Sequence, residues 1–256
     1  MLSKLIFITL ATANAFFNVG NFIKPTIRLS SGKTLTIDGN GPPLLFSTGL
    51  YGTMPRHFYN ELIDNLKKTM SVVTIDGLNP ITPKDIADVV NTLKVDTIAY
   101  MSHSSFNPEV LETDKINSAV LVDPICIPSI DYNGVHKPAV DVDYPVLVLR
   151  AEKLYKTEVP LPEWQELEIN GEDISDEMSE GVGHPDILDD LWGEVAIKLG
   201  LWGTAERESM NFKDWKFDTE NSIPKLRKNY REKTSKRALE FINGELINGE
   251  LINGES

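Results

Sequence analysis

Short, continuously apolar runs alternate along this chain with segments whose apolar positions recur at helical spacing. The apolar runs predict buried strands at Pro43–Thr48, Ser71–Asp76, Val95–Met101, Ser118–Asp123 and Pro145–Ala151. Helical spacing or a helix-opening proline predicts helices at Arg56–Met70, from Pro83, and at Pro185–Leu199. Strands that are apolar throughout are typical of a parallel sheet covered on both faces. We therefore expect an α/β fold with a mostly parallel central sheet flanked by helices.

The N-terminal segment has the pattern of a targeting sequence. Within residues 1–15, one lysine precedes a short apolar stretch and an Ala13-Asn14-Ala15 cleavage site, which predicts a secretory signal peptide; a buried N-terminal strand or helix is the alternative. Residues 16–25 open with two phenylalanines and contain no acid, as a transit segment does. The junction is similar to the bipartite plastid presequence of algae with secondary plastids. We expect plastid (chloroplast) localisation, with a secreted or endomembrane destination as the alternative.

Charge divides the C-terminal half into three parts. Residues 158–194 contain thirteen acids and no lysine or arginine, which predicts a solvated acidic face with mobile loops. Residues 225–240 contain seven bases, so we expect residues 204–240 to form a basic helical extension. Its segment 225–237 could dock on an anionic thylakoid or photosynthetic complex, or simply form an exposed charged helix. The repeats in residues 241–256, each with Asn-Gly, predict a flexible tail.

Composition excludes several classes of function. The 256 residues have a formal net charge of −13, which disfavours binding to nucleic acid. Cys126 is the single cysteine, so intramolecular disulfides and cysteine-based zinc sites are excluded. No apolar run reaches the roughly 18 residues of a transmembrane helix. No cofactor or metal is implied.

Three residue types with hydrolytic chemistry occur in the order serine, acid, histidine, each at or just past the end of a predicted strand or in a loop that could reach that edge. Ser104 comes after the strand Val95–Met101, Asp123 ends a strand, and His184 precedes a predicted helix. Parallel sheets bind ligands along the edge where their strands end, so these side chains are expected to meet there. Glu152, just after the strand Pro145–Ala151, is a rival acid. Serine, acid and histidine in this chain order are typical of α/β-hydrolases.

The motifs around these residues resemble those of plant chlorophyllases. The matching segments are His103-Ser104, Asp123-Pro124, the histidine motif Gly183–Asp190 and the loop Phe46–Gly52. The resemblance implies an α/β-hydrolase domain over residues 26–203, which hydrolyses a carboxylic ester of a hydrophobic substrate such as the phytyl ester of chlorophyll. It also implies the roles of nucleophile for Ser104, general base for His184 and orienting acid for Asp123. The backbone N–H groups of Leu50 and Ser105 would then stabilise the oxyanion.

Departures from that family leave a second hypothesis open. Phe106 stands where the G-x-S-x-G elbow has its second glycine, and Thr48 replaces a histidine of the oxyanion loop. Ser104 and Asp123 are also only nineteen positions apart, so the helix after the serine can have one or two turns at most. The alternative is a catalytically inactive hydrolase-fold protein that binds a pigment, a lipid or a photosynthetic complex.

Overall fold

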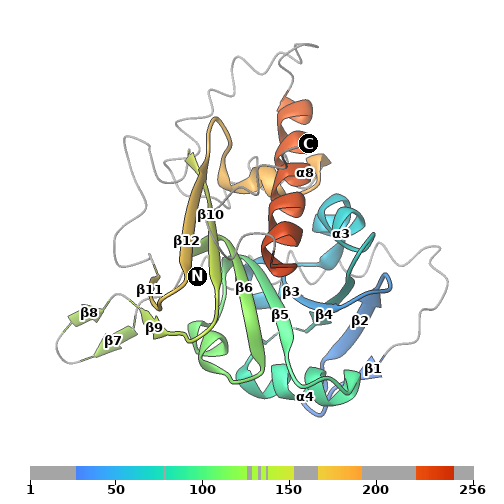
Figure 1. The fold of residues 1–256 in the computed structure, drawn as a ribbon, viewed down its shortest axis with the longest axis vertical. Helices are drawn as coiled ribbons and strands as arrows, with labels where there is room; N and C mark the ends of the chain where they lie inside the picture. Colours follow the sequence, from blue (N-terminus) through green and yellow to red (C-terminus); the bar gives the residue numbers. More distant parts are fainter. Residues whose placement is uncertain are drawn as a thin grey trace, which may run out of the picture.

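The central feature of the computed structural model is an eight-stranded sheet (Figure 1). The residues described are 27–77, 79–125, 129–131, 134–136, 138–152, 167–191 and 223–244. In spatial order the strands are β1 (Ile27–Arg28), β2 (Thr34–Asp38), β4 (Ser71–Asp76), β3 (Pro43–Ser47), β5 (Ile98–Ser105), β6 (Ile116–Ile125), β10 (Val146–Ala151) and β12 (Ile174–Ser179). β2 is antiparallel to both of its neighbours, and all the other pairs are parallel.

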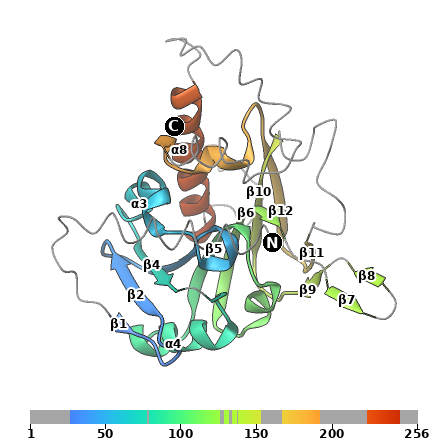
Figure 2. The ribbon, with the colours of Figure 1, turned by 180° about the vertical axis from the view of Figure 1, so that it is seen from behind.

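Helices cover both faces of this sheet (Figures 1 and 2). The helices α3 (Asn60–Leu66) and α8 (Ile223–Ile242) belong to one apolar core, which includes Phe46 of β3. The helix α4 (Pro83–Leu93) and the short 3₁₀ helix η2 (Pro108–Glu112) contribute to the other, which includes Leu45. Successive side chains of a strand point to opposite faces, so both must be apolar here. The predicted α/β architecture, a mostly parallel central sheet flanked by helices, is confirmed.

Local sequence explains where α4 begins and ends. Thr82 caps its N-terminus, because the Thr82 side chain accepts the Asp85 N–H and the Asp85 side chain accepts the Thr82 N–H. Pro83 occupies the first turn, where its missing N–H costs nothing. Lys94 ends the helix in the left-handed conformation.

Short elements complete the described part of the chain. They are the helices α2 (Gly49–Gly52), η1 (Arg56–Tyr59) and η4 (His184–Ile187), and the strands β7 (Ser129–Asp131), β8 (Gly134–His136), β9 (Ala139–Asp141) and β11 (Glu168–Asn170). β7 and β8 form a hairpin, while β9 and β11 pair in parallel.

Four sequence-based expectations differ from the structure. The helix expected over Arg56–Met70 is divided into η1 and α3, and it ends at Leu66. β5 begins at Ile98 and continues to Ser105, so the segment expected as a loop after Met101 is strand. The acidic segment was expected to form loops, but it contains the strand β12. Acidic side chains are accommodated in this strand because Asp176 pairs with Arg150, and Glu177 with Arg237. The helix expected from Pro185 begins as the 3₁₀ helix η4, and its residues beyond 191 lie outside the described part.

The basic segment is part of the core, which corrects the expectation of an appended or exposed helix. α8 spans Ile223–Ile242 and packs on α3, β6 and β10. Tyr230, Ala238 and Phe241 of α8 are buried in the same core as Phe46. No helix in the described ranges has the length and apolarity needed to cross a membrane. The predicted leader and transit segments, and the tail beyond residue 244, lie outside the described residues.

Candidate active site

Ser104, His184 and Asp123 form a continuous chain of hydrogen bonds. The Ser104 Oγ lies 2.9 Å from Nε2 of His184, and Nδ1 of His184 lies 3.1 Å from an Asp123 carboxylate oxygen. All three side chains are buried. A carboxylate only accepts hydrogen bonds, so Nδ1 of the neutral imidazole has the proton and Nε2 has the lone pair. His184 can therefore accept the proton of Ser104.

The sheet brings these residues to one edge. Ser104 is next to last in β5, Asp123 lies near the end of β6, and His184 follows β12, all strands that run parallel. Ser104 has a φ of 63° and Asp123 a φ of 47°, which residues other than glycine seldom adopt. Such strain is typical of functional sites, where the surrounding structure holds a side chain in a required direction.

The chain does not turn into an α-helix after Ser104. Ser105 is still in β5, where it pairs with Ile125 after a shift in register at His103/Ser105, and the next element is the short 3₁₀ helix η2. Phe106 points away from the site into the core shared with α4, where its ring lies 6.4 Å from that of Tyr100. The phenylalanine at the second glycine position is thus accommodated by a shortened connection. The oxyanion interpretation requires Ser105 at the start of a helix, whereas Ser105 is the last residue of β5.

The two candidate acids have different partners. Asp123 contacts His184 with one carboxylate oxygen and accepts the Ala151 N–H, at 2.6 Å, with the other. Glu152 accepts the N–H of Gly181 at 2.9 Å. In this arrangement Asp123 orients the imidazole, and Glu152 fixes the turn that leads to the histidine motif.

The loop Phe46–Gly52, which includes the short helix α2, packs against Ser104. A methyl group added to Gly49 would lie 3.4 Å from Cβ of Ser104, and 2.8 Å from the sulfur of Met54. Thr48 donates to the Met54 carbonyl at 2.8 Å and so closes the loop on itself. Leu50 follows Gly49 in the first turn of α2. The loop thus lies where an oxyanion loop is expected.

Tyr59 and His103 form a buried link that the sequence did not indicate. The Tyr59 Oη lies 2.8 Å from Nδ1 of His103 and accepts the Gly49 N–H at 2.9 Å. Nε2 of His103 lies 3.2 Å from the His184 carbonyl oxygen, so Nε2 has the proton and Tyr59 donates to Nδ1. Burial, and then the adjacent His184, hold the pKa of His103 well below its usual value. His103 is therefore a neutral residue that fixes the Gly49 loop and the His184 backbone.

Tyr59→Phe is expected to lower both stability and activity. The variant removes the buried hydrogen bonds that the Tyr59 Oη makes with the Gly49 N–H and with His103 Nδ1, which costs about 1–3 kcal/mol of unfolding free energy. Tyr144→Phe is a matched control, because it removes a 2.6 Å hydrogen bond to the Leu111 carbonyl away from the site. Urea denaturation and ester hydrolysis, measured on both variants, should show destabilisation in both and an activity loss only in Tyr59→Phe. Equal activity in the two variants would contradict a positioning role for Tyr59.

The same cluster of histidines and a carboxylate could in principle ligate a metal ion. Potential ligand atoms of His103, Asp123 and His184 lie within 4.8 Å of one another. However, Nε2 of His103 faces a carbonyl oxygen and has the proton, so it is not a ligand atom in this arrangement. The other ring nitrogens are hydrogen-bonded to Tyr59, Asp123 and Ser104. These donors fit proton transfer better than metal binding.

Asp189 of the histidine motif caps the helix α3. Its carboxylate accepts the N–H groups of Asn60 and Glu61, at 3.1 and 3.0 Å. Its own N–H donates to the Phe58 carbonyl at 2.8 Å. Burial, more than the nearby Glu61, raises the pKa of Asp189 to about 6, against a usual value of 3.8. The motif is therefore connected to α3 as well as to the site.

This raised pKa predicts a pH dependence of stability. Between about pH 4 and pH 6 the folded protein binds more protons at Asp189 than the unfolded chain does. The contribution of Asp189 to the free energy of unfolding therefore falls as pH rises through this window. Asp189→Asn removes this contribution. The free energy of unfolding, measured by urea denaturation at several pH values from about 4 to 6, should fall less with rising pH in the variant than in the wild type. Parallel curves for the two proteins would contradict the assignment of this effect to Asp189.

The chain was compared with known proteins. No protein-family model and no curated protein matches it in sequence. Solved structures with a similar arrangement include an epoxide hydrolase variant from Bacillus megaterium (9% identity, 69% of this chain, 99% of that chain, TM-score 0.45) and an α/β hydrolase from Sphaerobacter thermophilus (13%, 66%, 99%, 0.40). A third is an epoxide hydrolase variant from Vigna radiata (19%, 43%, 40%, 0.33), of which this chain spans less than half the length.

Proposed function

We propose that this α/β-hydrolase-fold chain is a serine esterase that hydrolyses a carboxylic ester of a hydrophobic substrate. The observation that carries the proposal is the hydrogen-bond chain from Ser104 through His184 to Asp123, on a serine held at a φ of 63°. A nucleophile within hydrogen-bond reach of a base, itself oriented by a third group, is the arrangement of acyl transfer.

In the proposed reaction, Ser104 Oγ attacks the ester carbonyl carbon and its proton passes to Nε2 of His184. Asp123 holds the imidazole in the correct tautomer and stabilises the imidazolium that forms. The tetrahedral intermediate breaks its bond to the alcohol oxygen, which leaves with the proton from His184. Water then attacks the acyl-serine, again with His184 as base, and the carboxylic acid is released. The neutral state of His103, whose ring centroid lies 4.5 Å from that of His184, avoids a second positive charge beside the imidazolium.

The resemblance assigns oxyanion stabilisation to the backbone N–H groups of Leu50 and Ser105, and the geometry favours Leu50, because Ser105 lies in β5 and does not open a helix. Leu50 follows Gly49, and Gly49 packs against Ser104. The Gly49 N–H itself is bound to Tyr59, so it is not available to the oxyanion in this state. Preorganised donors of this kind are typically the largest electrostatic contribution to acyl transfer.

The proposal extends to the substrate and its compartment. The resemblance of the histidine motif to chlorophyllases favours a phytyl ester of chlorophyll or a related pigment, and the N-terminal pattern favours the plastid. The exposed lysines of α8 (Lys225, Lys228, Lys233 and Lys236) are the part of the basic segment left for an anionic thylakoid partner.

A substrate panel tests this function. The purified protein is incubated with p-nitrophenyl acetate, butyrate and palmitate and with chlorophyll a, and the released alcohol is quantified. Turnover of the longer or phytyl esters is expected. Binding of chlorophyll, detected by quenching of tryptophan fluorescence, without release of phytol or p-nitrophenol would instead favour the inactive, pigment-binding alternative.

A further inference from the structure

Two arginines of α8 have fully buried side chains. Arg227 and Arg231 are 0% and 1% exposed, and they lie one helical turn apart. A buried guanidinium group is costly unless it is paired and its N–H groups are satisfied. The partners of these two arginines therefore show what the helix holds in place.

Most of those partners belong to the histidine motif. Arg227 Nε donates to the Asp186 carboxylate at 3.0 Å, and Arg231 donates to the Leu188 carbonyl at 2.7 Å and to the Asp190 carboxylate at 3.1 Å. Arg231 also contacts Glu61 of α3 at 2.7 Å. The N-terminal half of α8 is thus joined by charged hydrogen bonds to the segment that follows His184.

Asp186 extends this contact to the backbone beside the proposed base. One carboxylate oxygen accepts from Arg227, and the other accepts the Gly183 N–H at 2.8 Å. The Asp186 N–H donates to the Gly183 carbonyl at 3.0 Å. Gly183 directly precedes His184, whose own carbonyl is held by His103. The His184 backbone is therefore fixed from both sides, and one of the two anchors depends on Arg227.

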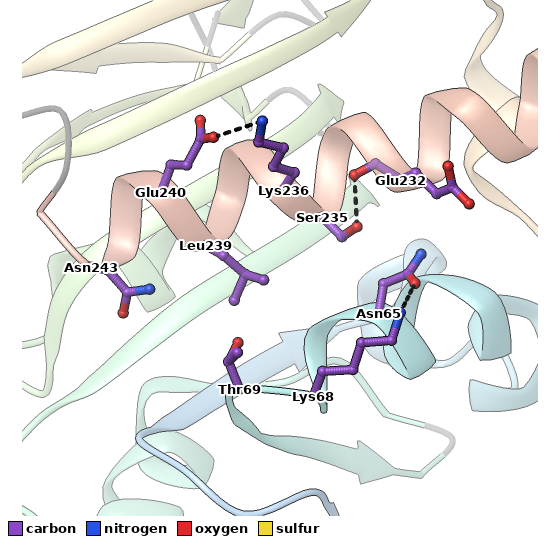
Figure 3. A pocket seen from close by; sticks show the side chains of 9 residues that line it. All are labelled: Asn65, Lys68, Thr69, Glu232, Ser235, Lys236, Leu239, Glu240 and Asn243. Atoms are coloured by element: carbon purple, nitrogen blue, oxygen red, sulfur yellow. Dashed lines mark hydrogen bonds and ion pairs between the residues drawn. The ribbon is translucent and has the colours of Figure 1, made fainter. Parts of the chain in front are cut away.

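The C-terminal half of α8 is bound less closely to α3. A groove of about 460 Å³ lies between the two helices there, lined by Asn65 of α3, by Lys68 just beyond its end, and by Lys236 and Leu239 of α8 (Figure 3). Further along α8, Arg237 pairs with Glu177 of β12 and with Glu240. Arg237 is thus a half-buried arginine on the same helix whose described ion pairs are with Glu177 and Glu240, outside the histidine motif.

We propose that Arg227, acting through Asp186, is a positioning residue that sets the geometry of His184, so that α8 completes the active site. This inference rests on the proposed esterase function. A lysine at position 227 keeps the positive charge, but its shorter side chain does not reproduce the 3.0 Å hydrogen bond from Nε to the buried Asp186 carboxylate. The carboxylate then rotates to find another donor, which weakens its hold on the Gly183 N–H and lets His184 move relative to Asp123 and Ser104. Displacement of a catalytic group by about 1 Å costs on the order of 10²-fold in rate.

Arg227→Lys tests the inference, with Arg237→Lys as the matched control on the same helix. We expect Arg227→Lys to lower kcat for p-nitrophenyl butyrate about 10-fold to 100-fold with KM nearly unchanged. Arg237→Lys should keep the wild-type kcat. If Arg227→Lys does not fold, Asp186→Asn is used, since it keeps the side-chain shape and removes the charge. Wild-type kcat in a folded Arg227→Lys or Asp186→Asn protein would overturn the inference.

A second measurement separates this inference from the esterase function. In the proton NMR spectrum, the Nδ1 proton of His184 should give a downfield resonance, assigned by its loss in Asp123→Asn. The resonance should shift or broaden in Arg227→Lys and stay in place in Arg237→Lys. That result in a protein that hydrolyses no ester would retain the positioning role and overturn the function alone. An unchanged resonance in Arg227→Lys would overturn the positioning role, whatever the activity.

Discussion

Replacing Ser104 with alanine is expected to lower ester hydrolysis by roughly 10⁴-fold or more, because it removes the hydroxyl that we propose forms the acyl intermediate. The substitution removes one oxygen and leaves the backbone and the His184–Asp123 contact in place. The rate is measured with p-nitrophenyl butyrate against enzyme-free buffer. An activity within 10-fold of the wild type would show that Ser104 is not the nucleophile.

Ser104→Gly extends this prediction to stability. Alanine has a Cβ atom, which makes a φ of 63° unfavourable, whereas glycine has none and adopts this conformation freely. The left-handed conformation costs a residue with a Cβ roughly 1–2 kcal/mol, so the glycine variant should be more stable than the alanine variant by about that amount. Both variants should be inactive. Chemical denaturation of the two proteins gives the difference, and a less stable glycine variant would contradict strain at this position.

Asp123→Asn is expected to cause the second large loss, on the order of 10⁴-fold in kcat. The amide can donate to Nδ1 of His184, which favours the tautomer with its proton on Nε2, and that tautomer cannot accept from Ser104. Asparagine also cannot stabilise the imidazolium. The rate of ester hydrolysis should fall while the fold is retained, as judged by circular dichroism.

Glu152→Gln is the matched control for Asp123→Asn. Each substitution converts one acid at the edge of the sheet into its amide, but Glu152 accepts from the Gly181 N–H at 2.9 Å and Asp123 contacts His184. We expect Glu152→Gln to keep kcat within about 10-fold of the wild type, since the amide oxygen can still accept this hydrogen bond. A loss in Glu152→Gln as large as that in Asp123→Asn would reassign the orienting acid.

The apolar runs predicted most of the sheet, because a strand buried on both faces leaves a clear local pattern. β4 was located to the residue at Ser71–Asp76. The end of β5 was missed, because His103 and Ser104 are polar and yet buried, with partners on distant elements. β12 was missed because its half-buried edge position allows Asp176 and Glu177, which pair with Arg150 and Arg237. Such pairs depend on contacts across the fold that no local pattern contains.

The site could be anticipated as a set of candidate residues but not as a geometry. Chain order and the histidine motif pointed to Ser104 and His184, and they left Asp123 and Glu152 as rivals. The structure distinguishes the two acids by the register of β6 and β10, which places the Ala151 N–H against Asp123. The contacts of Tyr59 and Arg227 could not be predicted, because each joins elements far apart in the chain. A tyrosine within a helical pattern and an arginine within a basic run gave no separate signal.

Reaction with a fluorophosphonate probe tests the central claim most directly. The folded protein is treated with the probe at neutral pH, digested, and the modified residue is identified by mass spectrometry. A hydroxyl activated by a neighbouring base reacts with such a probe, whereas an ordinary serine does not. We predict a single adduct on Ser104 that is absent in His184→Ala. A folded protein that gives no adduct, or an adduct at another residue, would contradict the account of Ser104 as an activated nucleophile.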